Sequence, residues 1–108
     1  MNETSRITWY PDIAAEAQIP RRGIHSQTLS DEDGVELVLF AMAAGERLSE
    51  HTSARPAIIH VLSGDAELMA GGETHEAGPG AWLRMPIRMA HAIVARTDLV
   101  FALYLLPA

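Results

Sequence analysis

The sequence contains no cysteine and no lysine, and these two absences exclude several kinds of chemistry. Without cysteine there is no disulfide, no thiolate nucleophile and no thiolate metal ligand. Without lysine there is no Schiff-base nucleophile. The G-x-S-x-G motif of serine hydrolases and the glycine-rich phosphate loop are also missing. Any catalysis must therefore use the five histidines, the fourteen acidic residues, the two tyrosines or hydroxyl groups.

Positive charge is scarce, and long apolar runs are missing. The net charge is -6, and Arg21 and Arg22 are the only adjacent basic residues, so we expect no nucleic-acid partner. No stretch approaches the roughly 20 apolar residues of a membrane helix. The first ten residues are polar and lack the pattern of a secretory signal. The sequence therefore predicts a cytoplasmic protein with no membrane partner.

The length of 108 residues predicts one domain preceded by a short arm. Residues 1–22 form this N-terminal arm, and residues 23–108 form the domain. Within the arm, residues 12–18 are typical of one or two helical turns that Asp12 caps and Pro20 ends. The aromatic residues Trp9 and Tyr10 are expected to pin the arm onto the domain.

The domain itself shows short apolar segments separated by turn residues, which is typical of strands. Ser30–Gly34 forms one predicted turn, and Gly71-Gly72 predicts a tight hairpin. Eight or nine strands at this spacing predict an all-β sandwich or jelly-roll barrel. The predicted strands are Gly23–Leu29, Val35–Ala43, Pro56–Leu62, Ala66–Ala70, Glu73–Ala77, Ala81–Met85, His91–Arg96 and Leu99–Leu106.

Two of these strands are apolar on both faces. In the segment 35–42 both alternating sets of side chains are apolar except for Glu36, and the segment 99–106 is apolar except for Tyr104. An antiparallel strand with one face in water alternates apolar and polar residues instead. Burial of both faces predicts a homodimer, and the alternative is that the N-terminal arm covers the second face.

Two motifs resemble those of the cupin superfamily. Gly45 precedes His51 by six positions and Gly64 follows, as in the first cupin motif. The segment from Gly80 to His91, in which Pro86 precedes the histidine by five positions, is similar to the second motif. The resemblance covers about residues 35–106. It implies an RmlC-like jelly-roll barrel with a short N-terminal arm.

The metal motif of this resemblance is degenerate. Metal-binding cupins use two histidines and a glutamate from the first motif and one histidine from the second. His51 and His91 match the first and the last of these ligands. Ser53 stands at the position of the second histidine, Ala57 at that of the glutamate, and Arg88 at that of a glycine in the second motif. Half of the ligand set is absent.

A divalent ion held by protein usually needs three or four ligands, so two histidines alone form a weak site. Two alternatives therefore remain for this site. His51 and His91 bind one divalent ion (Zn, Ni, Fe or Mn), or the site binds no metal. Candidates for a third ligand are His25, His60 and His75. Strand alternation turns His60 away from the cavity if Ala57 points inward, whereas His75 shares its face with Ala77.

Other residues are expected at the cavity. Ser53 could hydrogen-bond a ligand or cap a strand end. Trp82, Met85 and Met89 could form an apolar wall or pack in the core, and Arg88 could bind a carboxylate or phosphate at the rim. The predicted cavity residues are His51, Ser53, Trp82, Met85, Arg88 and His91.

Three functions remain open, because a fold does not determine a function. The first is binding of a small molecule in the barrel cavity, with at most a weak metal site. The second is a metal-dependent enzyme, a dioxygenase or isomerase, whose site a third ligand completes. The third is a structural or regulatory dimer without small-molecule chemistry, in which side chains fill the cavity. The sequence favours the first.

Overall fold

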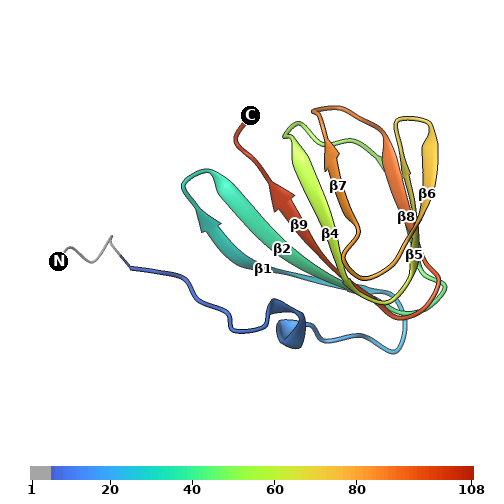
Figure 1. Ribbon diagram of the computed structural model, residues 1–108, viewed down its shortest axis with the longest axis horizontal. Helices are drawn as coiled ribbons and strands as arrows, with labels where there is room; N and C mark the ends of the chain where they lie inside the picture. Colours follow the sequence, from blue (N-terminus) through green and yellow to red (C-terminus); the bar gives the residue numbers. More distant parts are fainter. Residues whose placement is uncertain (1–5) are drawn as a thin grey trace.

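Nine short strands form two antiparallel sheets that pack face to face as a jelly roll (Figure 1). The computed structural model describes residues 6–108, so residues 1–5 of the predicted arm lie outside the described residues. The strands are β1 (Ile24–Glu32), β2 (Val35–Met42), β3 (Arg47–His51), β4 (Ala57–Ser63), β5 (Ala66–Ala70), β6 (Glu73–Ala77), β7 (Trp82–Met85), β8 (His91–Ala95) and β9 (Leu99–Leu105). The predicted all-β jelly roll is confirmed.

The two sheets have different sizes. The five-stranded sheet has the order β1-β2-β9-β4-β7, and the four-stranded sheet has the order β3-β8-β5-β6. One sheet therefore ends at β7 and the other at β6. Strands that are far apart in sequence, such as β3 and β8, are direct neighbours.

The core lies between the sheets and consists of apolar side chains from both inner faces. Phe40 and Phe101 stack with their ring centroids 4.8 Å apart, and Met42, Leu99 and Ile93 are almost completely buried around them. Burial of such side chains contributes roughly 1.5–3 kcal/mol each relative to exposure. This core fixes the register of both sheets.

The first hairpin differs from its prediction. The segment Ser30–Gly34 was expected to be a turn, but β1 continues to Glu32 and pairs with Val35. Only Asp33 and Gly34 turn, and both have a positive φ, 55° and 79°. Two residues with positive φ suit the right-handed twist of a hairpin, and Asp-Gly is a preferred pair for this turn.

Residues 6–12 of the arm have no regular secondary structure, and one turn of 3₁₀ helix, η2 (Ile13–Glu16), follows them before β1. Asp12 caps this turn, because its Oδ1 accepts a hydrogen bond from the amide of Ala14 at 3.1 Å. Tyr10 anchors the arm by donating its hydroxyl hydrogen to the carbonyl of Leu29 at 2.8 Å. Trp9 does not pin the arm, because 73% of it is exposed.

Within residues 6–108, no helix is long and apolar enough to cross a membrane. The cytoplasmic location stays a prediction.

Candidate functional site

The two histidines of the cupin-like motifs lie side by side at one end of the sandwich. His51 ends β3 and His91 begins β8, and the two residues are direct partners in the β3–β8 ladder. Their ring centroids are 4.1 Å apart, with 58° between the ring planes. His91 is buried, whereas His51 is exposed. The sheet pairing thus brings together two residues that are forty positions apart in sequence.

Both imidazole rings are held in the same way. The Nδ1 of His51 lies 2.8 Å from the carbonyl oxygen of Ser49, and the Nδ1 of His91 lies 2.9 Å from that of Met89. A carbonyl oxygen can only accept, so each neutral ring carries its proton on Nδ1. Each Nε2 therefore keeps a lone pair that can accept a hydrogen bond or bind a metal ion.

The environment of His91 favours its neutral form. Burial lowers the pKa of His91 from its ordinary value, the hydrogen bond to the Met89 carbonyl raises it, and the nearby His51 lowers it, with a net decrease. A neutral His91 keeps its Nε2 lone pair at neutral pH. The Nε2 of His91 is therefore suited to accept a hydrogen bond rather than to donate one.

The donor set around this pair does not fit a firmly held metal ion. Among residues 6–108, no three His, Asp or Glu side chains lie together in a geometry that could hold one. The two lost ligand positions have become structural: the Oγ of Ser53 accepts from the amide of Arg55 at 3.1 Å, and Ala57 is buried in the core. Two imidazoles leave most of the coordination positions of a divalent ion unfilled.

The three histidines considered as third ligands lie in different places. His25 pairs with Ala41, and His60 pairs with Trp82, on the outer face of the five-stranded sheet. Neither can reach the histidine pair across the core. His75 pairs with the core residue Leu68 and so stands on the inner side of the edge strand β6, where 60% of its side chain is exposed.

The inner face of the four-stranded sheet carries one carboxylate that sequence reasoning missed. His51, His91, Ala70 and Glu73 are successive partners in one row across β3, β8, β5 and β6. The Oε1 of Glu73 lies 3.1 Å from the Nε2 of His75 on the same strand. Side chains alternate between the two faces of β6, so Glu73 and His75 lie on the same inner face as the buried Ala77. The sheet order shows that this face also carries the histidine pair.

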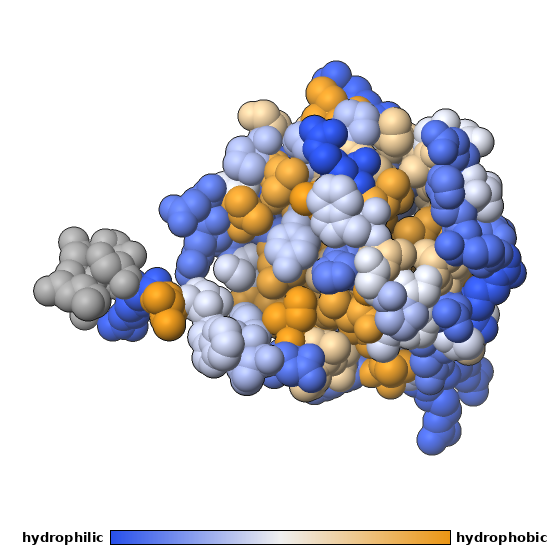
Figure 2. All heavy atoms as spheres, viewed as in Figure 1, coloured by the Kyte–Doolittle hydropathy of each residue, from blue (hydrophilic) through white to orange (hydrophobic). Residues whose placement is uncertain are grey.

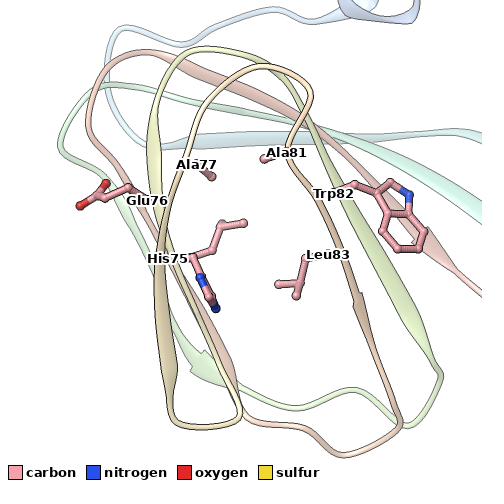
Figure 3. Close-up of a pocket in the computed structure, with 7 residues that line it drawn as sticks. His75, Glu76, Ala77, Ala81, Trp82 and Leu83 are labelled. Carbon is pink, nitrogen blue, oxygen red and sulfur yellow. The ribbon is translucent and has the colours of Figure 1, made fainter.

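A cleft of about 350 Å³ opens between the edge strands β6 and β7. Its lining is mainly apolar. Figure 3 shows His75 and Leu83 on facing sides of this cleft, while the indole of Trp82 points away from it. The lining residues are Leu68, His75, Glu76, Ala77, Ala81, Trp82 and Leu83. Neither His51 nor His91 lines this cleft.

The predicted cavity residues therefore separate into groups. His51 and His91 lie together, and Trp82 stands at the rim of the cleft. Met85 does not line the cleft but is packed in the core, with 1% of it exposed. It points inward because it pairs with Ala57 across β4 and β7.

Arg88 occupies the position at which the second cupin motif has a glycine, and it keeps a glycine-like backbone. Its φ is 62°, in the left-handed region that costs a residue with a Cβ atom some strain. Its amide donates to the carbonyl of Ser53 at 2.8 Å, which joins the loop before β8 to the loop after β3. Its guanidinium is exposed and has no hydrogen-bond partner within the described part of the chain.

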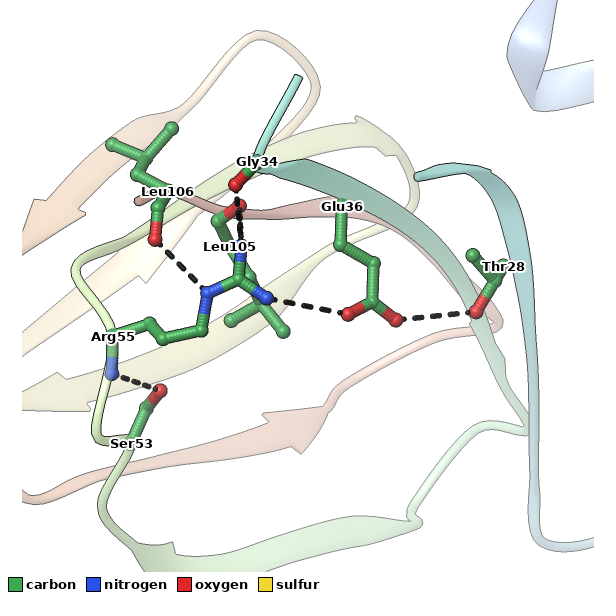
Figure 4. Close-up of polar contacts among 7 residues, drawn as sticks. All are labelled: Thr28, Gly34, Glu36, Ser53, Arg55, Leu105 and Leu106. Atoms are coloured by element: carbon green, nitrogen blue, oxygen red, sulfur yellow. Dashed lines mark hydrogen bonds and ion pairs between the residues drawn. The ribbon is translucent and has the colours of Figure 1, made fainter. Parts of the chain in front are cut away.

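Arg55 holds this end of the sandwich together (Figure 4). Its Nε donates to the carbonyl of Leu106 at 3.0 Å, and its Nη2 donates to the carbonyls of Gly34 at 2.6 Å and Leu105 at 3.0 Å. Its Nη1 pairs with Glu36 at 3.5 Å. The fork of one guanidinium thus links the segment before β4 to the start of β2 and the end of β9. No sequence signal identified this role.

Comparison with protein families matches residues 38–106 to the cupin domain. The chain belongs to the cupin family. Both histidines, the cleft residues and the Arg55 segment of this cupin fall within the matched region. Comparison with curated proteins found no match.

Several solved structures are similar to this cupin. A conserved protein of unknown function from Streptococcus pyogenes is 24% identical with a TM-score of 0.83, over 95% of this chain and 90% of that one. A cupin superfamily protein from Desulfitobacterium hafniense is 23% identical with a TM-score of 0.82, over 89% and 88%. A mutant salicylate 1,2-dioxygenase from Pseudoaminobacter salicylatoxidans is 14% identical with a TM-score of 0.72, over 77% of this chain and 26% of that one. At these identities the likeness shows the fold alone.

Proposed function

We propose that this cupin binds a small, mostly apolar molecule in the cleft between β6 and β7, with His75 as its main polar contact. The observation that carries the proposal is the cleft itself, which has a volume of about 350 Å³ and an inward-facing histidine on one wall. Small-molecule sites are typically concave and apolar, of about 300–1,000 Å³, with a few placed polar groups.

The lining indicates the chemical class of the ligand. Leu68, Ala77 and Leu83 offer apolar surface, which suits a single ring or a short branched chain. Glu73, beside His75 on β6, places one carboxylate near the rim, and its negative charge disfavours an anionic ligand. Glu76 is paired with Arg96 on the outer face instead. A neutral molecule with one hydrogen-bonding group fits this combination.

The histidine pair extends the polar side of this site. His91 lies in the row next to that of Leu68 and His75, on the same inner face. Its Nε2 lone pair can accept a hydrogen bond from a ligand that reaches beyond the cleft, and the pair can hold at most a weak divalent ion. This arrangement supports ligand binding without a resident metal.

Calorimetric titration with phenol, benzamide and cyclohexanol tests the proposal, together with two matched variants. Leu83→Trp fills the cleft from β7, whereas Thr74→Trp adds the same bulk to an exposed position on β6 beside His75. We expect saturable binding of at least one probe to the wild type and to Thr74→Trp, and its loss in Leu83→Trp. Binding that survives in Leu83→Trp would contradict the assignment of the cleft, as would the absence of saturable binding to folded wild type.

A further inference from the structure

The outer face of the four-stranded sheet carries charged side chains around one apolar hollow. In Figure 2, hydrophilic residues gather along the side of the molecule where Figure 1 places β5, β6 and β8. Arg96 accounts for part of this charge, because it pairs with both Glu67 and Glu76. The hollow has a volume of about 240 Å³ and lies over β3, β8 and β5. It is lined by Arg47, Ser49, Glu50, Met69 and Ala92.

The floor of this hollow is formed by two neighbouring apolar side chains. Met69 on β5 pairs with Ala92 on β8, and the next pair along the same ladder, Leu68 with Ile93, belongs to the core. Side chains alternate between the faces of a strand, so Met69 and Ala92 point to the outer face, away from the cleft and the histidine pair. Ala92 is nevertheless only 7% exposed, which indicates that larger side chains surround it.

An irregularity in β3 brings two polar side chains to the rim of the hollow. The β3–β8 register shifts by one residue between Leu48 and His51. Ser49 and Glu50 therefore stand together opposite the single residue Ala92, which is the arrangement of a β-bulge. Both residues line the hollow, whereas in a regular strand their side chains would point to opposite faces. The bulge thus directs a hydroxyl and a carboxylate toward one apolar floor.

The two charged groups at the rim have no partner of their own within residues 6–108. Neither Arg47 nor Glu50 forms an ion pair with another residue in this range. Arg47 lies in one row with Val94 and Glu67, but Glu67 is bound by Arg96 instead. One guanidinium and one carboxylate therefore border the floor, and their opposite charges sum to zero.

We propose that this hollow binds a free α-amino acid with a small apolar side chain. The guanidinium of Arg47 binds the carboxylate of the ligand, and the hydroxyl of Ser49 donates to it. Glu50 binds the ammonium group, while the side chain of the ligand packs on the apolar floor. A ligand with only one charge leaves either Arg47 or Glu50 without a partner.

The size of the hollow agrees with such a ligand. Its volume of about 240 Å³ lies below the roughly 300–1,000 Å³ of sites for drug-sized molecules, so the occupant has few heavy atoms. Met69 is flexible enough to adapt to side chains of different shape, such as those of valine and methionine. This site is separate from the cleft between β6 and β7, because it lies on the opposite face of the sheet.

Titration of isotope-labelled protein with L-valine, followed through the backbone amide resonances, tests the site. We expect saturable shifts at Met69 and Ala92, and none at the cleft residues Ala77 and Leu83. N-acetyl-L-valine lacks the ammonium group, and L-valinamide lacks the carboxylate. Both are expected to bind about three- to tenfold more weakly than valine, because each loses one of the two ion pairs.

Two variants assign the charges. Arg47→Met is expected to weaken the binding of valine about three- to tenfold but not that of valinamide, which has no carboxylate to lose. Glu50→Gln is expected to weaken the binding of valine similarly but not that of N-acetylvaline. Arg84→Met and Glu16→Gln, which remove the same charges from exposed positions elsewhere, are the controls and should bind valine as the wild type does.

The proposal would be overturned by a folded wild type that shows no saturable shifts with valine, or by shifts that gather in the cleft. Equal affinities for valine and its two blocked derivatives would overturn it as well. So would valine binding that Arg47→Met and Glu50→Gln both leave unchanged. Far-UV circular dichroism checks that each variant is folded. None of these outcomes bears on the cleft, which phenol, benzamide and cyclohexanol probe separately.

Discussion

Glu73 and His91 lie in one row of the inner face of the four-stranded sheet, separated only by Ala70 on the strand between them. The carboxylate of Glu73 is turned to His75, which lines the cleft. The polar groups of this inner face thus lie at one end of the sandwich and lead from the histidine pair to the cleft.

The pKa of His91 gives the stability a defined pH dependence. Because burial, the largest cause, lowers this pKa below its ordinary value of 6.5, the unfolded chain takes up the proton at higher pH than the folded chain. The unfolded state therefore binds more protons as the pH falls below 6.5, and the free energy of unfolding decreases. Urea unfolding between pH 8 and pH 5 should show this decrease. The decrease should be smaller in His91→Gln. If the free energy of unfolding of this variant changed with pH as much as that of the wild type, His91 would not be its cause.

The histidine pair should bind metal weakly. We expect elemental analysis of untagged protein to find far less than one zinc, nickel, iron or manganese ion per chain, because no more than two donors converge among residues 6–108. Weak uptake from excess zinc should be lost in His51→Ala and in His91→Ala. His25→Ala, on the outer face of the other sheet, is the control and should keep it. A stoichiometric ion that both pair variants remove would refute the two-donor description.

Arg55 should be important for stability. Its side chain donates to three backbone carbonyls and pairs with Glu36, so Arg55→Met leaves several partly buried acceptors unpaired. We expect a loss of about 2–4 kcal/mol in the free energy of unfolding, measured with urea. Arg47→Met, at an exposed strand position, should change it by less than about 0.5 kcal/mol. Equal effects of the two substitutions would show that the Arg55 contacts contribute little.

Arg88→Gly should stabilise the protein. Arg88 has a φ of 62°, which glycine adopts without the strain that a Cβ atom causes. Relief of this strain is expected to exceed the cost of the greater chain entropy of glycine in the unfolded state. The free energy of unfolding should therefore rise by about 0.5–1 kcal/mol. Arg84→Gly, inside β7, is the control and should destabilise instead. Thermal unfolding of both variants measures the two signs, and a loss of stability in Arg88→Gly would mean that its side chain makes a stabilising contact.

The fold could be predicted well from the sequence because glycine and proline mark its turns. The number and spacing of the strands predicted a sandwich or jelly roll, and the resemblance carried by Gly45, Gly64 and Pro86 implied a cupin barrel with His51 and His91 in one cavity. Strand β3 was missed because it is polar, with only Leu48 half-buried, and it is held mainly by pairing with β8.

The cleft could not be predicted, because it depends on sheet order. The strands β6 and β7 follow one another in sequence but belong to different sheets, and the cleft exists only because each is an edge strand. The role of Glu73 depends on the same non-local pairing, which places it in the row of His91. Met85 was expected either at the cavity wall or in the core. Its pairing with Ala57 turns it into the core.

The most direct test of the proposed binding site is a titration of isotope-labelled protein with benzamide, followed through the backbone amide resonances. Binding in the cleft predicts saturable shifts that gather at the cleft residues Leu68, His75, Ala77 and Leu83 and disappear in Leu83→Trp. Shifts confined to His51 and His91, or small linear shifts spread over the surface, would contradict binding in the cleft between β6 and β7.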